Sequence, residues 1–277
     1  MKKNNNEGIN KLPPNRFTAF FLLLKGNFKE YIYLSLLTTI FFLPLFLLFL
    51  GKQAYYLTIV SSETLVFSKI LGLDLVYGLL RMPLFMIGFL ALEGLIGVLR
   101  KIFFKENYLL ISDFFASIRK NYRGALLAGF LFSFVLLVIN INMDFISYGD
   151  ATLPLYIKII ILIVSLIVGL FLMMMVMFIL PLNAIYDLSL GNLIKNSTLL
   201  AIGYFFKNFV FVIAIMWPLI LMELFFNIFV SIILFVLVST LFMAIIMSID
   251  LLYATNIFDL AINAKYCKEL YRKGLSQ

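Results

Sequence analysis

Two ionisable side chains lie within one long apolar stretch of the chain and are its strongest candidates for chemistry. Arg81 and Glu93 both fall in segment 75–99. A charge at the centre of a membrane helix costs roughly 2.5–3.5 kcal/mol on insertion scales, so ionisable residues there are functional suspects. The two residues are twelve positions apart, which is about 18 Å along a helix, and they therefore cannot pair with each other.

The sequence predicts different roles for these residues. Arg81 is close to one end of the stretch, where a long basic side chain can extend to the membrane surface. Glu93 is deeper, and Gly94 and Gly97 allow another helix to approach it closely. Glu93 is therefore the main candidate for an intramembrane polar site, either hydrogen-bonding a neighbouring helix or binding a proton or an ion. Asp250 is expected at the end of a span, where a carboxylate costs little.

Several chemistries are excluded by what the sequence lacks. It has no histidine and a single cysteine, Cys267, which removes histidine metal sites, imidazole bases, Ser-His-Asp triads and disulfide bonds within the chain. It also has no phosphate-binding loop of the P-loop type. The methionines at 173–175 and 177 are interpreted as packing residues. We therefore predict that the protein is not an enzyme and has no catalytic residue, metal or cofactor.

The elements that must hold these residues are membrane helices. Apolar residues make up 64% of the chain and charged residues 13%, whereas soluble proteins carry roughly 25% charged residues. A helix needs about 20 mainly apolar residues to cross the hydrocarbon core. Six segments are candidates, at 31–50, 75–99, 124–142, 155–182, 209–221 and 225–249. The fifth is short and contains Trp217 and Pro218, so a re-entrant element is the alternative there.

This pattern predicts an all-α fold, a polytopic integral membrane helix bundle. A single transmembrane domain occupies 31–249, between tails at 1–30 and 250–277. No residue pattern indicates a separate soluble domain.

Basic residues predict the orientation, because short loops rich in lysine and arginine remain on the cytoplasmic side. Eighteen of them lie in the two tails and in the loops after the second and fourth spans, whereas only Lys52, Lys69 and Lys158 lie on the other side. Both termini are thus expected in the cytoplasm of a bacterial cell. The net charge of +8 is spread over these loops, which favours a lipid bilayer with anionic headgroups, and not nucleic acid, as the partner.

A similar sequence precedes three of the spans. An asparagine followed by an aromatic residue, beside basic residues, occurs at Asn27, Asn121 and Asn208. One interpretation is a repeat of about ninety residues that forms three tandem helical hairpins. The other is that basic and aromatic residues belong at any cytoplasmic membrane interface.

Two segments between spans are predicted to form short interfacial amphipathic helices, N-capped by Ser112 and Ser189. Such helices either anchor a loop or dock a cytoplasmic partner. The candidate residues for docking a partner or lipid are Phe114, Phe115, Arg119, Lys120, Tyr122, Arg123, Lys195 and Asn196.

Two stretches carry a resemblance to a known family. The first combines Gly97-Val98-Leu99-Arg100-Lys101, Ser112-Asp113-Phe114-Phe115 and Lys120-Asn121-Tyr122-Arg123, and the second combines Tyr186-Asp187-Leu188-Ser189-Leu190 with Ile194-Lys195-Asn196-Ser197. Over roughly residues 17–209 the chain resembles the YesL-like family of bacterial multi-pass membrane proteins, a domain of unknown function. The resemblance implies a protein of the cytoplasmic membrane of Gram-positive-type bacteria, associated with carbohydrate-uptake importers and their regulators. Glu93 and the last two spans depart from the family pattern, and the family supplies no ligand residues.

Three hypotheses for function follow. The leading one is a non-enzymatic accessory subunit of a carbohydrate-uptake importer of the ABC type, docking importer subunits through 114–123 and 189–200. The second is a stand-alone transporter or channel for a small solute, whose path is lined by Glu93 and by spans broken at Pro44, Pro83 and Pro218. The third is an envelope or lipid-organising protein whose basic loops bind anionic lipid.

Overall fold

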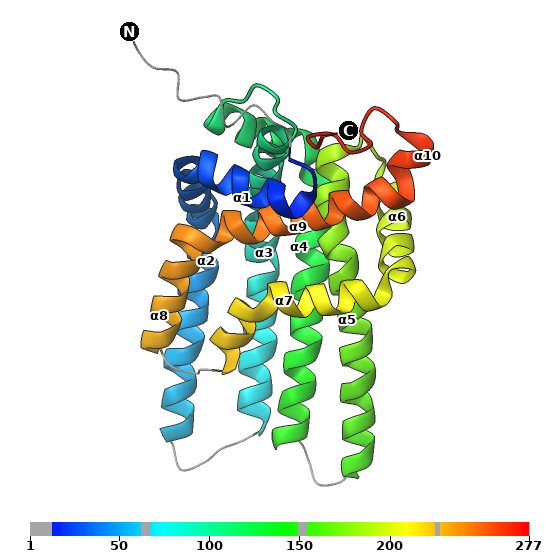
Figure 1. The fold of residues 1–277 in the computed structure, drawn as a ribbon. Coiled ribbons are helices and arrows are strands. Elements are labelled where there is room, and N and C mark those ends of the chain that lie inside the picture. Colours follow the sequence, from blue (N-terminus) through cyan, green and yellow to red (C-terminus); the bar gives the residue numbers. More distant parts are fainter. Residues whose placement is uncertain (1–12, 62–66, 149–153, 225–227, 277) are drawn as a thin grey trace.

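The computed structural model describes residues 13–61, 67–148, 154–224 and 228–276, and every regular element in this part of the chain is helical. Four long helices run side by side and alternate in direction (Figure 1). They are α2 (Phe28–Ser61), α3 (Phe67–Phe103), α4 (Leu110–Tyr148) and α5 (Leu155–Ile185). Each is long and apolar enough to cross a membrane, which confirms a polytopic helix bundle. Contrary to expectation, Pro44 and Pro83 do not break their spans, because α2 and α3 continue through them.

The antiparallel pair α3 and α4 makes the most extensive contact in the bundle. Glycines let the two backbones approach. A Cβ atom at Gly129 would lie 2.7 Å from the Cα atom of Met86, and one at Gly97 would lie 1.9 Å from the Ser117 hydroxyl. Close packing of this kind stabilises membrane helices, for which lipid offers no hydrophobic gain. The close approach expected at Gly97 is therefore confirmed.

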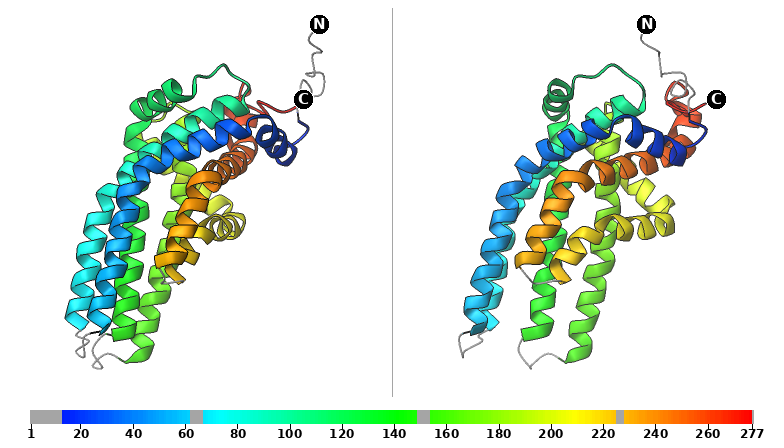
Figure 2. Two further views of the ribbon diagram at one scale, coloured as in Figure 1. Left: turned by 90° about the vertical axis from the view of Figure 1, so that its left-hand side faces the viewer. Right: turned by 60° about the vertical axis from the view of Figure 1, so that its left-hand side comes forward.

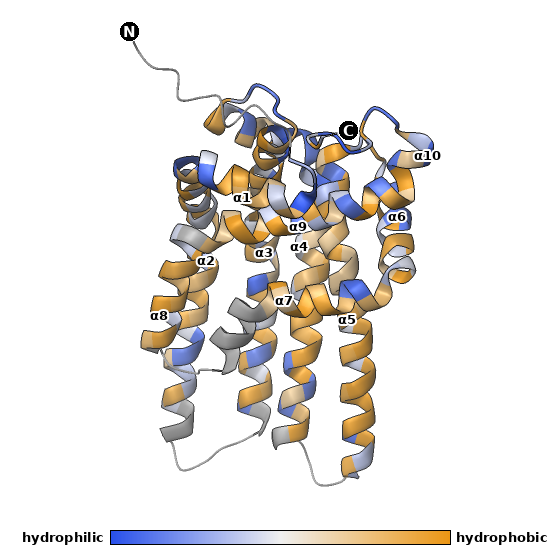
Figure 3. Ribbon diagram, viewed as in Figure 1, coloured by the Kyte–Doolittle hydropathy of each residue, from blue (hydrophilic) through white to orange (hydrophobic). Residues whose placement is uncertain are grey.

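The two ends of the bundle differ in polarity. We call the end where α3 ends and α4 begins the basic end, because Arg100 and Lys101 close α3 there, and the opposite end the far end. Hydrophilic residues gather at the basic end, whereas α5 is hydrophobic over most of its length (Figure 3). The described ends of the chain also meet there, since the Ser276 amide donates to the Pro13 carbonyl at 2.9 Å. They therefore lie at the same end of the bundle.

A polar cluster, which we call the terminal clasp, joins the first helix to the last at this end. Arg16 begins α1 (Arg16–Gly26) and forms an ion pair with Asp259, where α9 continues into η2 (Asp259–Asn263) and then α10 (Ala264–Tyr266). Asp259 also accepts hydrogen bonds from the Asn263 side chain at 2.9 Å and from the Arg272 amide at 3.2 Å. Burial lowers the pKa of Arg16, and the Asp259 carboxylate opposes that effect.

A second layer of helices covers one face of the four-helix bundle (Figure 2). It contains α6 (Leu190–Gly203), α7 (Phe205–Leu224), α8 (Ile228–Leu237) and α9 (Met243–Phe258). The axes of α6 and α7 differ by 101°, and α7 then runs across the long helices (Figure 1). The fifth expected span is therefore part of a bent pair, a broken or re-entrant element. The described chain holds five helices long enough to cross a membrane, or six if this pair counts as one.

The sixth expected span, 225–249, differs from the structure, and its first three residues lie outside the described ones. α8 has 10 residues, about 15 Å, which is too short to cross. The π-helical segment η1 (Val238–Phe242) joins it to α9, and the chain changes direction there (Figure 1). The helix long enough to cross is Met243–Tyr266 instead.

Side chains of α2 hold this bend. The Ser35 hydroxyl accepts a hydrogen bond from the Ala244 amide at 3.0 Å, and the Thr39 hydroxyl donates to the Ser239 carbonyl at 3.3 Å. Backbone groups that an irregular membrane helix leaves free must find such partners, because lipid offers none. The bend is thus built into the packing of α2 against η1.

The three asparagines of the sequence pattern do not have one common role. Asn27 ends α1 and Asn208 lies in the first turn of α7, and each side chain donates to a carbonyl of the preceding short helix, at 3.1 and 3.0 Å. Asn121 lies inside the continuous helix α4 and donates to Glu93 instead. The structure therefore supports equivalence of the first and third positions, but not a threefold repeat of identical junctions.

Candidate functional site: a central apolar cavity

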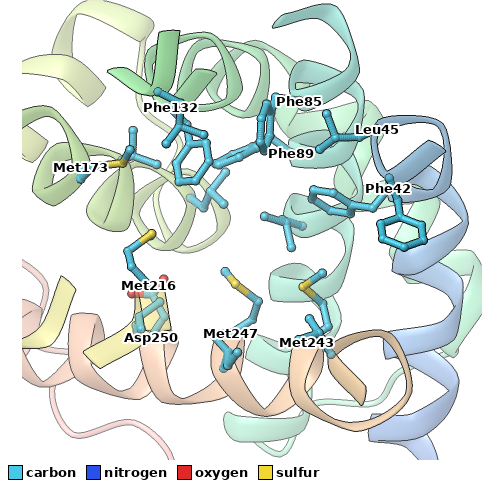
Figure 4. A pocket seen from close by; sticks show the side chains of 18 of the residues that line it. Phe42, Leu45, Phe85, Phe89, Phe132, Met173, Met216, Met243, Met247 and Asp250 are labelled. Atoms are coloured by element: carbon cyan, nitrogen blue, oxygen red, sulfur yellow. The ribbon is translucent and has the colours of Figure 1, made fainter. Parts of the chain in front are cut away.

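A cavity of about 260 Å³ lies between the four-helix bundle and the second layer. Aromatic side chains of α2, α3 and α4 line one side together with Met173 of α5, and methionines of α7 and α9 line the other (Figure 4). The labelled residues of its wall are Phe42, Leu45, Phe85, Phe89, Phe132, Met173, Met216, Met243, Met247 and Asp250. A concave, mainly apolar space with a few polar groups is the usual form of a small-molecule site.

Asp250 is the carboxylate of this cavity. It projects from α9 into the cavity beside Met216 (Figure 4). Its side chain is 3% exposed, and its Oδ1 atom is buried without a hydrogen-bond partner among the described residues. An unpartnered carboxylate in an apolar interior is costly, so a ligand that donates to it would be favoured. This corrects the expectation that Asp250 lies at the end of a span.

Arg81 also lines the cavity. The prediction that its side chain extends to the membrane surface is therefore wrong. Its side chain is 1% exposed, and its Nε and Nη2 atoms have no partner within the described chain. The guanidinium carbon lies 5.1 Å from the Tyr77 ring centroid, and the Lys52 ammonium lies 4.7 Å from the same ring. When the Asn140 amide is oriented to satisfy both of its groups, its oxygen accepts from Arg81 Nη1 at 3.2 Å. Arg81 is thus held by cation–π and hydrogen-bond contacts inside the bundle.

Charged residues continue from Tyr77 toward the far end. Lys52 of α2 forms an ion pair with Asp74 of α3, and the Asp144 carboxyl of α4 lies close to that of Asp74. The sequence did not indicate Asp74 and Asp144, because the expected spans ended at 50 and 142 and the second began at 75; Lys52 was expected in a loop. All three residues lie inside α2, α3 and α4, which extend beyond the apolar segments.

Glu93 does not line the cavity but forms a separate buried site near the basic end. Its side chain is 0% exposed and accepts a hydrogen bond from Asn121 Nδ2 at 2.8 Å. Asn183 of α5 faces the same carboxyl and donates to the Asn121 carbonyl at 2.7 Å. The predicted hydrogen bond from Glu93 to a neighbouring helix is therefore present, and it joins α3, α4 and α5. Arg81 and Glu93 do not come together.

The first predicted docking helix is not a separate element. Residues 110–123 are the start of the continuous helix α4, which begins at Leu110, so Ser112 lies inside the helix and does not cap it. In its first turn the Asp113 side chain accepts from the Leu109 amide at 2.8 Å. Phe114 is 0% exposed, so it cannot contact a partner or lipid. The other candidates on this stretch are exposed, and they are Phe115, Arg119, Lys120, Tyr122 and Arg123.

The second predicted docking helix is present as α6. Ser189 caps it as predicted, accepting from the Asn192 amide at 3.4 Å. Lys195 is exposed and Asn196 is half-buried. α6 packs against α5 through Leu193 and its neighbours and leads into α7, so it forms part of the bent pair and does not stand free.

Within the described ranges, no group of three or more cysteine, aspartate or glutamate side chains is arranged to hold a metal ion. The sequence matches no protein-family model, and no curated protein or solved structure is similar to the chain. The resemblance to the YesL-like family therefore stays a prediction.

Proposed function

We propose that the protein is a stand-alone membrane carrier for a small organic cation with an apolar body. The observation that carries this proposal is the unpartnered Asp250 carboxylate on the wall of the apolar cavity. An amine or ammonium group on the solute satisfies this carboxylate, while the aromatic and methionine side chains contact the apolar body. Methionine walls adapt to different shapes because the side chain is flexible and polarisable.

The position of the cavity supports transport. It lies where the second layer meets the bundle, beside the bend at η1. Carriers commonly bind their solutes near the middle of the membrane, at interrupted helices that can move relative to a more regular bundle. In this proposal the basic end faces the cytoplasm, because lysine and arginine are retained on that side.

Solute binding tests the proposal with Asp250→Asn and a matched control, Asp187→Asn, whose carboxylate lies on the surface. We expect small alkyl- and arylamines to raise the melting temperature of the purified wild-type protein and of the control, but not of Asp250→Asn. Without amine, Asp250→Asn should melt at the wild-type temperature or above it, because the wild-type carboxyl already lacks a hydrogen-bond partner there and its replacement breaks no contact. Equal stabilisation of all three proteins, or of none, would overturn the cation site.

Transport needs its own measurement. The amine that stabilises the wild-type protein most is loaded into liposomes containing each protein, and its efflux is followed with time. We expect efflux for the wild type and Asp187→Asn, and at least a tenfold slower efflux for Asp250→Asn. Binding without efflux would show a cation-binding protein and would contradict a carrier.

A second candidate is the accessory subunit of a carbohydrate importer. It is favoured by the exposed aromatic and basic strip at the start of α4, with Phe115, Arg119 and Arg123, and by the resemblance to the YesL-like family. Purification from the native membrane in mild detergent tests it. Stoichiometric importer subunits that are lost in Arg119→Ala/Arg123→Ala would support this candidate. A protein that purifies only with anionic lipid would favour the lipid-organising hypothesis.

A further inference from the structure

A second open space, distinct from the central cavity, lies at the basic end. It is a cleft of about 530 Å³ between α4 and the connection from α5 to α6. The polar residues of its lining include Lys120, Asn121, Arg123, Asn183, Tyr186 and Ser189. Two of these residues, Asn121 and Asn183, are the ones that contact Glu93.

Glu93 lies directly behind these two amides. Asn121 both lines the cleft and donates to Glu93 Oε1 at 2.8 Å, so one hydrogen bond separates the cleft from the carboxyl. The other oxygen, Oε2, is buried and has no hydrogen-bond partner in the described part of the chain. The approach of α4 to α5 is close here, since a Cβ atom at Gly124 would lie 2.6 Å from Asn183 Nδ2. The amides therefore form a thin and tightly packed barrier.

The charged groups around Glu93 are engaged elsewhere. On α3, Arg100 donates to the Ala184 carbonyl and to Glu106, both at 3.1 Å. On α4, Lys120 forms an ion pair with Asp187 at 2.7 Å.

The remaining polar and charged side chains of the cleft also have partners other than Glu93. The Arg123 guanidinium donates to the Tyr122 hydroxyl at 3.0 Å, and on the connection after α5 the Tyr186 hydroxyl donates to Asn263 at 2.6 Å. Arg119 is exposed to the surroundings of the bundle. A carboxylate buried with amide donors and no cation is strongly disfavoured, whereas a protonated carboxyl offers a donor and carries no charge.

We propose that Glu93 is a proton-binding site that exchanges with the aqueous phase at the basic end through this cleft. In the exchange a hydronium ion gives its proton to a Glu93 carboxylate oxygen and leaves as water, and the reverse step returns the proton. Rotation of the Asn121 or Asn183 amide opens the path. Because the cleft and the central cavity are separate, this site does not depend on the proposed cation site at Asp250.

Infrared spectroscopy of the purified full-length protein tests the proposal, because a protonated carboxyl has a carbonyl band separate from that of a carboxylate. We expect the wild-type spectrum near neutral pH to contain a protonated-carboxyl component that Glu93→Gln removes and Asp250→Asn does not. Asn121→Ala should shift that component to higher frequency, because a hydrogen bond to the carboxyl is lost. A Glu93→Gln spectrum with an unchanged protonated-carboxyl region would overturn the proposal.

Access through the cleft is tested with the same band. On transfer to heavy water the Glu93 component should shift as its proton exchanges for deuterium. Asn183→Leu, which replaces a polar amide of the barrier by an apolar side chain of similar size, should slow that exchange at least tenfold, whereas Lys195→Ala on exposed α6 should leave it unchanged. Equal exchange rates in the three proteins would exclude the cleft as the route. Protein that melts at the wild-type temperature is required for each comparison.

Discussion

Arg16 and Asp259, 243 residues apart in the sequence, form a buried ion pair that fixes the first helix against the last. Arg16 also donates to the Lys273 carbonyl at 3.1 Å and lies 4.7 Å from the Phe103 ring centroid. The pair therefore joins four segments: α1, the end of α3, η2 and the C-terminal tail.

Removing one partner of this pair should be strongly destabilising. Asp259→Ala leaves the buried Arg16 guanidinium without its countercharge, and breaking a buried pair in this way costs about 3–5 kcal/mol. We expect a lower melting temperature and rapid protease cleavage within α1. The matched control is Asp187→Ala, which breaks the exposed pair with Lys120 and should change little. Similar losses in the two variants would contradict a special role for the clasp.

The clasp region should also loosen in acid. Burial by itself raises the pKa of Glu106, but the ion pairs with Lys273 at 2.7 Å and Arg100 at 3.1 Å outweigh it, so its pKa lies below the ordinary value of 4.5. A lowered pKa in the folded state stabilises the protein above the unfolded value and loses this effect as the pH falls through the folded value. We expect the protection of the tail 267–276 against hydrogen exchange, relative to the intrinsic rate at each pH, to fall below about pH 4.5. Glu106→Gln should show fast exchange at neutral pH already, and an acid profile identical to the wild type would refute this link.

The glycine contact between α3 and α4 predicts a clear difference between two alanine substitutions. Gly129→Ala places a methyl group 2.7 Å from the backbone of Met86, which cannot rotate away, and we expect a loss of about 1–3 kcal/mol from overpacking. Gly72→Ala on α3 meets nothing within 4 Å, so it should be neutral or slightly stabilising, because alanine favours the helix. Thermal unfolding in detergent separates the two, and equal melting temperatures would show that the helices can separate without cost.

The bend between α8 and α9 should depend on Ser35. Ser35→Ala leaves the buried Ala244 amide without its acceptor, at a cost of about 1–3 kcal/mol. The control is Thr240→Ala, within η1, because the Thr240 hydroxyl donates only to carbonyls of the preceding turn, at the end of α8. We expect a lower melting temperature for Ser35→Ala than for Thr240→Ala. The reverse order would mean that α2 does not hold the bend.

The sequence by itself determined the class of the protein, because the length and hydropathy of a membrane helix are properties of one continuous segment. The first four spans, the cap at Ser189 and the close approach at Gly97 are of this local kind. Only the tertiary structure decided where the last helices bend, since the partners that allow the break at η1, Ser35 and Thr39, lie some 200 residues away. The same bend brings Asp250 from the expected end of a span to the wall of the cavity.

The burial of Arg81 and Phe114 was likewise decided by the tertiary structure. Arg81 and Phe114 each carry a side chain that a single helix could direct either to a neighbour or to the membrane surface. The packing of α3 against α4 decides the outcome, by placing Asn140 beside Arg81 and by burying Phe114 against α3. Because such contacts join positions far apart in the chain, their energy does not appear in any local pattern of residues.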